Sequence, residues 1–144
     1  MGGLAGTSHG TDAHIEACYA RGTVQGAHVV GSLLGANGRN RGRGVLPVVN
    51  SGTVRHCYAA CSVTAQDVAG GCIGAGVSDT KCQGCYFLAL DDGDGPDNGC
   101  GTALSAEAMR QQASFVGWDF QTVWMICEGQ DYPRLRWEGV ECQE

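Results

Sequence analysis

A chain of 144 residues is long enough for one domain that buries roughly two thirds of its unfolded surface. Its 24 glycines and three prolines follow no Gly-x-y period, which excludes collagen and proline-rich disorder. The formal net charge of −6 disfavours nucleic acid as a partner. No stretch has the length and apolarity of a membrane span.

A Gly-x-x-x-Gly cluster followed at a variable distance by a Cys-Tyr pair occurs three times. From Cys18 to the next cluster at Gly31, and from Cys57 to the one at Gly70, the separation is the same 13 residues. A constant segment joined to a variable one is typical of a stacked repeat, whose loops vary while its strands stay in register. The clusters occupy residues 2–6, 31–35 and 70–74, and the pairs are Cys18-Tyr19, Cys57-Tyr58 and Cys85-Tyr86.

We therefore expect three copies of one structural unit, followed by a cap that belongs to the same domain. Glycine permits tight corners, so each copy is predicted to hold several short strands. The copies are residues 2–30, 31–69 and 70–97, together making residues 1–98, and the cap is residues 99–144.

The predicted fold is all-β: a parallel β-helix or β-solenoid of about three coils, closed by a C-terminal cap that contains one short helix. In copy one, strands are expected around residues 4–6 and 14–24. Equivalent residues of the three copies, such as Leu4, Leu33 and Cys72, should then lie in a single file.

The facing of the Cys-Tyr pairs can be counted in two ways, because side chains alternate along a strand. Counting back from Val24 turns Cys18 inward, whereas counting forward from Ile15 turns Tyr19 inward. Copy two gives the same disagreement, which predicts a bend or bulge near each pair. We favour tyrosine inward and cysteine at the corner.

The C-terminal segment reads differently from the copies. Residues 106–113 are strong helix formers, with Ser105 as the N-cap and Glu107 in the first turn, so we expect a short α-helix there. Six of the ten aromatic residues lie between 115 and 137. A stacked repeat exposes an apolar end, so this segment is predicted to cover it, with Asp119 bonding a turn backbone.

Nine cysteines are an odd number for a simple disulfide framework. Cys18, Cys57 and Cys85 share one repeat position, and we expect them to be buried thiols stacked in a column. Cys127 and Cys142 lie outside the copies, and a disulfide between them is predicted, which would suit an oxidising compartment.

The glycine clusters, followed by Gly-Thr-Val and Cys-Tyr-Ala, resemble the GLUG-motif repeats of secreted and surface bacterial proteins. Such repeats also occur beside the catalytic part of some secreted immunoglobulin-cleaving metallopeptidases. The chain departs from the pattern before each Cys-Tyr pair, where the frequent Asn is Ala17, His56 or Gly84. The C-terminal segment is similar to the one that often follows the last repeat, through residues 104–109, 115–120, Trp124, 128–129, Tyr132, Pro133, Leu135 and Trp137.

This resemblance implies a non-enzymatic extracellular or cell-surface module with a scaffold or adhesion role. Polysaccharide or a surface protein is the expected partner. No signal peptide is recognised before the first copy, so we expect either that it lies outside this sequence or that the chain is a short reading frame of its own. The alternative is a carbohydrate-binding or carbohydrate-active β-helix. The first coil is expected to be uncovered, so a second copy of the chain is another expected partner.

The acidic loop at residues 91–99 offers a candidate metal site. Carboxylates alternating with glycine can wrap calcium, which takes six to eight oxygen ligands. The candidate ligands are Asp92, Asp94 and Asp97, although the spacing is not that of an EF-hand. A solvated linker is the other interpretation, and a calcium-stabilised structural module is a further functional alternative. No other cofactor is expected.

Tyr19, Tyr58 and Tyr86 are the candidate ligand-binding residues. Stacked at the inter-strand spacing of about 4.8 Å, they would form a ladder of rings that could bind sugars if they faced outward. Facing inward, they would be core, which is the interpretation we favour. Cys82-x-x-Cys85 has a redox or zinc spacing, but no second pair completes such a site.

Overall fold

A computed structural model describes residues 1–8, 12–37, 52–66, 68–75, 82–89 and 100–143. Within these ranges the chain is built mostly of short strands. The strands of the copies are β1 (Ala5–Ser8), β2 (His14–Glu16), β3 (Tyr19–Gly26), β4 (Val29–Gly31), β5 (Leu34–Asn37), β6 (Thr53–Arg55), β7 (Tyr58–Ala65), β8 (Val68–Gly70), β9 (Ile73–Ala75), β10 (Cys82–Gln83) and β11 (Tyr86–Leu88).

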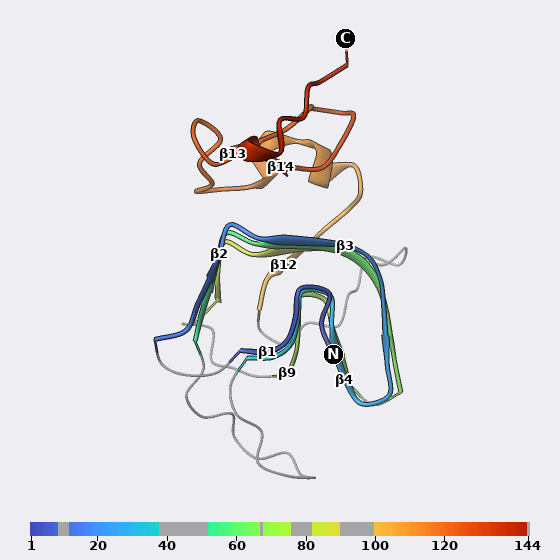
Figure 1. Ribbon diagram of the computed structural model, residues 1–144. Helices are drawn as coiled ribbons and strands as arrows, with labels where there is room; N and C mark the ends of the chain where they lie inside the picture. The colour runs from blue at the N-terminus through green and yellow to red at the C-terminus, as the bar shows by residue number, and fades with distance from the viewer. Residues whose placement is uncertain (9–11, 38–51, 67, 76–81, 90–99, 144) are drawn as a thin grey trace.

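Strands at equivalent positions of the copies pair with one another, and every such pair is parallel. The sheets run β1-β5-β9, β2-β6-β10, β3-β7-β11-β12 and β4-β8. In Figure 1 the copies therefore lie one behind another along the line of sight, with β2 and β3 of copy one in front of their counterparts. Strand β12 (Thr102–Leu104) extends the third sheet beyond copy three, pairing Thr102 with Tyr86. The sequence analysis assigned residues 102–104 to the cap, whereas in the structure they form a strand of this sheet.

The register between copies is the one that the repeat predicts. Tyr19 pairs with Tyr58, and Tyr58 with Tyr86. Leu4 N–H donates to Leu33 O over 2.8 Å, and Leu33 N–H donates to Cys72 O over 2.9 Å. The expected single file is thus confirmed at the level of the backbone, and the all-β assignment with parallel sheets is confirmed with it.

Glycine is required in the clusters because the backbones of neighbouring copies come very close there. A Cβ atom at Gly31 would overlap the carbonyl oxygen of Leu34 and the amide nitrogen of Gly74. At Gly35 it would lie 2.5 Å from the carbonyl oxygen of Gly6. A side chain at either position would push two copies apart and break the pairing on both sides.

The expected bend lies one residue before each Cys-Tyr pair. Ala17 and His56 have φ of 51° and 49°, and Gly84 has φ of 59°, so all three adopt the left-handed conformation. Asn tolerates this conformation better than most residues with a side chain. This gives a physical reason for the Asn that is frequent at this position in the repeats that the chain resembles. The bend separates β2 from β3 and also reverses the facing of the residues after it.

The favoured facing of the pairs is wrong because of this bend. Cys57 and Cys85 lie in the interior cluster enclosed by the copies, with Val30, Leu33, Leu34, Val54 and Ile73. Tyr58 and Tyr86 lie on the opposite face, in a second cluster shared with Met109, Phe115, Trp118 and Trp124 of the C-terminal segment. The sheet β3-β7-β11 therefore separates two apolar clusters.

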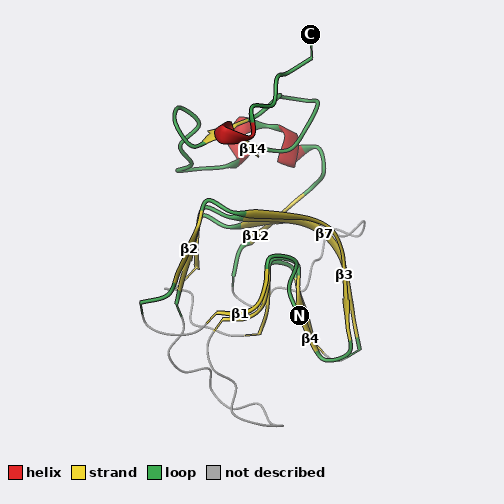
Figure 2. Cartoon of the chain, in the orientation of Figure 1, coloured by secondary structure: helices red, strands yellow, loops and turns green. Residues whose placement is uncertain are grey.

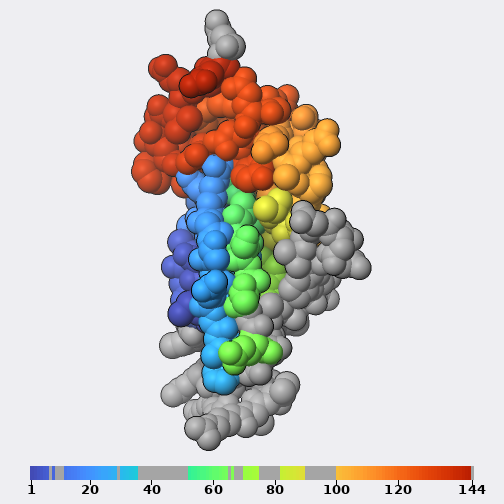
Figure 3. Space-filling view, turned by 90° about the vertical axis from the view of Figure 1, so that its right-hand side faces the viewer, coloured from blue at the N-terminus to red at the C-terminus, as the bar shows by residue number. Residues whose placement is uncertain are grey.

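The C-terminal segment, residues 105–143, lies across this sheet as the second layer (Figure 2). Figure 3 shows the copies as adjacent bands, with this segment lying across all of them. It covers a side of the stack formed by the three copies together, whereas the sequence analysis expected it to cover the apolar end beyond the last copy. Its elements are the 3-10 helices η2 (Ala108–Arg110), η3 (Gln112–Ser114) and η4 (Arg136–Glu138), and the antiparallel strands β13 (Trp124–Met125) and β14 (Arg134–Leu135).

The α-helix predicted at 106–113 is absent from the described residues, where two 3-10 turns replace it. The Ser105 hydroxyl does accept the Ala108 N–H over 3.1 Å, as an N-cap would. Gln111 is extended, however, and the next amide, that of Gln112, donates to the Glu128 carboxylate over 2.9 Å. Contacts with the rest of the segment thus take the backbone groups that would continue a helix. No helix in the described ranges could span a lipid bilayer.

Replacing Trp124 with Ala should destabilise the fold by about 3–5 kcal/mol, because it leaves a cavity in the second cluster. The Trp124 side chain is 1% exposed and its ring lies 4.4 Å from that of Trp118. The matched control is Trp137→Ala, since Trp137 is 81% exposed and its loss should change stability by less than about 0.5 kcal/mol. Urea unfolding followed by circular dichroism measures both, and equal losses would contradict the two-layer arrangement.

Candidate functional site

The three equivalent tyrosines form a ladder on the outer face of the sheet. The rings of Tyr19 and Tyr58 stack with their centroids 5.1 Å apart and their planes within 2°. Tyr86, the next in register, meets the ring of Phe115 edge-on at 5.2 Å. The sequence predicted this column and its spacing.

The C-terminal segment occupies the face of the ladder that a ligand would use. The Tyr19 hydroxyl donates to Glu138 Oε1 over 2.7 Å, and the Tyr58 hydroxyl donates to Pro133 O over 2.7 Å. The Tyr86 hydroxyl accepts the Val116 N–H over 3.2 Å. Every hydroxyl of the ladder thus bonds the same segment, and Tyr58 has no exposed surface.

Burial favours the protonated form of two of these hydroxyls, those of Tyr19 and Tyr58. It raises the pKa of Tyr58, and it is the largest of the effects that raise the pKa of Tyr19. A protonated hydroxyl can donate a hydrogen bond. Tyr19 and Tyr58 therefore bind Glu138 Oε1 and Pro133 O as neutral donors.

Charged side chains surround the exposed end of the ladder. Arg21 donates from Nε to the Tyr58 hydroxyl over 2.9 Å and from Nη1 to Asp131 Oδ1 over 3.0 Å. Its guanidinium also lies 5.0 Å from the ring centroid of Tyr132 and 5.5 Å from that of Tyr19. Such contacts are worth about 0.5–2 kcal/mol when partly desolvated, so Arg21 holds the sheet and the segment together.

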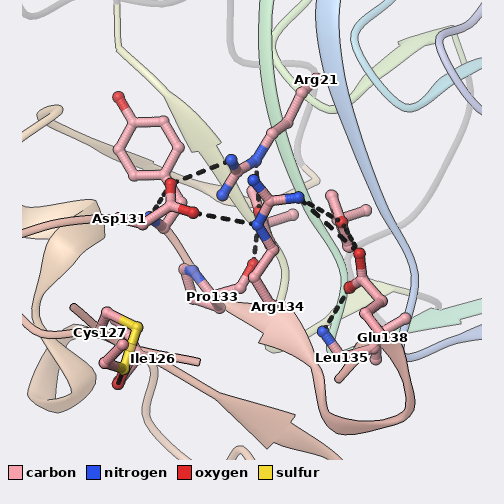
Figure 4. A network of polar contacts seen from close by, with 12 residues as sticks. Arg21, Ile126, Cys127, Asp131, Pro133, Arg134, Leu135 and Glu138 are labelled. Carbon is pink, nitrogen blue, oxygen red and sulfur yellow. Dashed lines mark hydrogen bonds and ion pairs between the residues drawn. A yellow bond between two sulfur atoms is a disulfide. The ribbon is translucent and has the colours of Figure 1, made fainter. Parts of the chain in front are cut away.

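Asp131 lies between two arginines (Figure 4). Besides Arg21, its carboxylate accepts from Arg134 Nε over 3.0 Å and from the Tyr132 N–H over 2.8 Å. Burial raises the pKa of Asp131, but the hydrogen bonds from Tyr132 and Arg134 and the charge of Arg21 outweigh it, so the pKa lies below its ordinary value. Arg134 in turn reaches the Tyr19 hydroxyl over 3.3 Å.

Sequence reasoning missed this group. One signal was available for Arg21, which lies two residues after Tyr19 and therefore shares its face of β3. No such periodicity points to Asp131 or Arg134, because they belong to irregular chain whose path depends on the ladder. The turn at Asp119 was predicted, and its carboxylate does accept from the amides of Gln121 and Thr122 over 2.8 and 2.9 Å.

On the inner face, the cysteines form the predicted column. Each thiol donates to the carbonyl two residues earlier: Cys18 to Glu16 over 3.2 Å, Cys57 to Arg55 over 3.1 Å and Cys85 to Gln83 over 3.5 Å. Arg55 O also accepts the Ala17 N–H over 3.2 Å, and Gln83 O accepts the His56 N–H over 2.9 Å. At these two positions the thiol is therefore a second donor to a carbonyl that is already paired with the neighbouring copy.

The thiols of neighbouring copies also contact one another. The neighbouring Cys57 side chain lowers the pKa of Cys18 to about 7, against the effect of burial. The neighbouring Cys18 and Cys85 side chains, together with burial, raise the pKa of Cys57. Cys61, buried near Ser32, has its pKa raised by burial.

Two disulfides join the remaining cysteines. The predicted bond between Cys127 and Cys142 is present. A second, Cys82–Cys100, was not predicted, because Cys82 was considered only with Cys85. It ties β10 to the residues that lead into β12. The sequence analysis did not expect a fourth strand after copy three, and it therefore gave no reason to pair Cys82 with Cys100.

The candidate calcium ligands Asp92, Asp94 and Asp97 lie outside the described residues, so calcium at this loop stays a prediction. Within the ranges that are described, no three His, Cys, Asp or Glu side chains gather as a metal site would require. The chain matches no protein-family model, and neither a curated protein nor a solved structure is significantly similar to it.

Replacing Asp131 with Asn should lower stability at pH 7 by on the order of 1 kcal/mol, because the pair with two arginines is partly exposed. A depressed pKa contributes stability that is present above the unfolded value near 3.8 and lost as pH falls through the folded value. The difference between the variant and the parent chain should therefore shrink below about pH 4. Thermal melts from pH 3 to 8 measure it. Glu141→Gln, at an exposed position, is the control, and a difference that persists at pH 3 would contradict this role.

Proposed function

We propose that this chain is a non-enzymatic extracellular or cell-surface repeat module with a scaffold or adhesion role, built as a short β-solenoid of about three coils. The fold part of this proposal is supported by the pairing of each strand of copy one with its counterpart in copy two, in parallel and in register. Stacking of this kind buries a continuous core that no copy could form alone.

The observation that carries the structural role is the use of the tyrosine ladder. Its rings and all three hydroxyls bind the C-terminal segment, so the side chains best suited to bind a sugar serve cohesion instead. The charged residues beside them, two arginines and two carboxylates, pair with one another across the same boundary: Arg21, Arg134, Asp131 and Glu138. This arrangement favours a rigid building unit over a binding cleft.

The extracellular part of the proposal is supported by the two disulfides. Disulfides persist in oxidising compartments and are rare where glutathione keeps thiols reduced. Both bonds lie at the C-terminal side of the molecule, where Cys82–Cys100 ties copy three to β12 and Cys127–Cys142 closes the segment. They stabilise the part of the chain with the least regular structure.

An adhesion role predicts saturable binding without chemical change. The folded chain is to be screened against immobilised polysaccharides and bacterial surface proteins, and incubated with the same polysaccharides to detect cleavage products. The reduced and alkylated chain is the control, since it should lose both disulfides and its binding. Turnover of any polysaccharide would contradict the proposal and favour a carbohydrate-active β-helix, whereas binding to none would leave only the scaffold role.

A second copy of the chain is the proposed partner for the face formed by copy one. In the described part of the chain, β1, β2 and β3 each end their sheet and have a strand neighbour on one side, whereas Gly31 of β4 also pairs with Gly2. Leu4 is 44% exposed, whereas its equivalents Leu33 and Cys72 are buried. An open strand edge with apolar side chains is a template for pairing with another chain.

Self-association should therefore appear as a dimer or larger species whose proportion rises with concentration. Light scattering after size exclusion measures it between micromolar and millimolar concentrations. Leu4→Asp should reduce the association at least tenfold, because a charge would have to be buried. Val116→Asp is the control, since Val116 is also an exposed apolar residue, at 75%, but lies in the C-terminal segment, where its backbone N–H bonds Tyr86. A clean monomer at every concentration would contradict this partner.

A further inference from the structure

Five of the nine cysteines remain thiols in a molecule that also holds two disulfides. Four of the five are buried, and Cys18 is partly exposed. Cys18 belongs to copy one, which has no strand on its outer side among the described residues. It is therefore the thiol that a small solute reaches first.

Cys57 is the neighbour of Cys18 in the adjacent copy. The register places Glu16 opposite Arg55 and Tyr19 opposite Tyr58, so the residues between them correspond as well. The Tyr58 N–H donates to Cys18 O over 3.1 Å, which confirms that the two strands stay paired through the bend. Neighbouring strands lie about 4.8 Å apart, within the range of about 4.4–6.8 Å that a disulfide requires between Cα atoms.

The two cysteine side chains lie on the same face of the sheet. Cys57 belongs to the interior cluster of the copies, and Cys18 packs against that cluster from the adjacent position. Neither partner would have to leave its strand for the sulfurs to bond. Cys61, by contrast, lies in the same interior but donates to Ser32 O over 3.6 Å.

We propose that Cys18 is a redox-active thiol that a hydroperoxide oxidises and that Cys57 then resolves, closing a disulfide between copies one and two. Reactive cysteines of this kind are partly exposed, carry thiolate character and lie beside a resolving cysteine. Cys18 is partly exposed, its neighbour in register is Cys57, and the Cys57 side chain lowers the pKa of Cys18.

The chemistry proceeds in two steps. The Cys18 thiolate attacks an oxygen of the hydroperoxide, the O–O bond breaks, and the alkoxide or hydroxide leaves and takes a proton, which oxidises Cys18 to a sulfenic acid. The Cys57 sulfur then attacks the Cys18 sulfur. An S–S bond forms, the S–O bond breaks, and water leaves with the proton of the Cys57 thiol. Two thiols and one hydroperoxide thus give one disulfide, one alcohol or water from the leaving group, and one further water.

The new bond would strengthen the least buried copy. Ile15, Cys18 and Tyr19 are only partly buried, whereas their equivalents Val54, Cys57 and Tyr58 are fully buried. At the other end of the copies, Cys82–Cys100 already joins copy three to β12. Oxidation would give both ends of the stack a covalent link between adjacent strands.

Peptide mapping of the intact, folded chain tests the proposal directly. The protein is treated with hydrogen peroxide, its remaining thiols are alkylated, and it is cleaved without reduction. Cleavage after Arg21, Arg55 and Lys81 puts Cys18 in residues 1–21 and Cys57 in residues 56–81. We expect these two peptides to be linked and the intact mass to fall by two hydrogen atoms. Because residues 56–81 also contain Cys61 and Cys72, fragmentation must assign the bond to Cys57.

Variants separate the two roles. Dimedone should trap a sulfenic acid on Cys18 in Cys57→Ser, at least tenfold more than in the parent chain, because the resolving thiol is gone. Cys18→Ser should abolish the cross-link, and Cys61→Ser, which removes a buried thiol outside the column, should leave it unchanged. Circular dichroism confirms that each variant is folded, and the cross-link in the parent chain needs no variant at all.

Three results would overturn the proposal. One is conversion of Cys18 to sulfinic or sulfonic acid in the parent chain without a cross-link. Another is a cross-link of Cys57 to Cys85, which would mean that the buried thiols react first. The last is a Cys18 thiol that stays reduced under peroxide that fully oxidises free cysteine in the same solution.

Discussion

Backbone hydrogen bonding between equivalent residues of successive copies is the constraint on which the rest of this structure depends. Single strands of three or four residues have no stability in isolation, and here they persist because each one is paired with its counterpart in register. Pairing at that distance leaves no room for a side chain at Gly31 or Gly35. The glycine clusters therefore recur in the sequence where the backbones of neighbouring copies come into contact.

The bend before each Cys-Tyr pair directs the cysteine and the tyrosine to opposite faces of the sheet. Since the chain turns at Ala17, His56 and Gly84, the cysteine enters the interior while the tyrosine points outward. The interior is filled by small and aliphatic side chains and by thiols. The outer face carries aromatic rings that the C-terminal segment covers. One local conformation, repeated three times, produces both apolar clusters.

The sequence was sufficient for what repeats and insufficient for what occurs once. The register of the copies, the bend, the cysteine column and the Cys127–Cys142 bond all follow from spacing or position. The facing of the pairs was misjudged because alternation was counted through a left-handed residue. Residues 106–113 have the propensity of a helix, yet the Glu128 carboxylate binds the Gln112 amide. Contacts such as Arg21 with Asp131 join distant segments, and no local pattern encodes them.

The attachment of the C-terminal segment limits the number of copies that it can cover. Three residues of the segment each hydrogen-bond the tyrosine hydroxyl of a different copy: Glu138, Pro133 and Val116. The segment is therefore matched to a sheet of three equivalent strands. A unit inserted between two of these copies would displace one hydroxyl from its partner by about 4.8 Å, beyond the reach of a hydrogen bond. Repeat arrays change length readily by duplication. This one can gain a copy between the existing three only if the C-terminal segment changes as well.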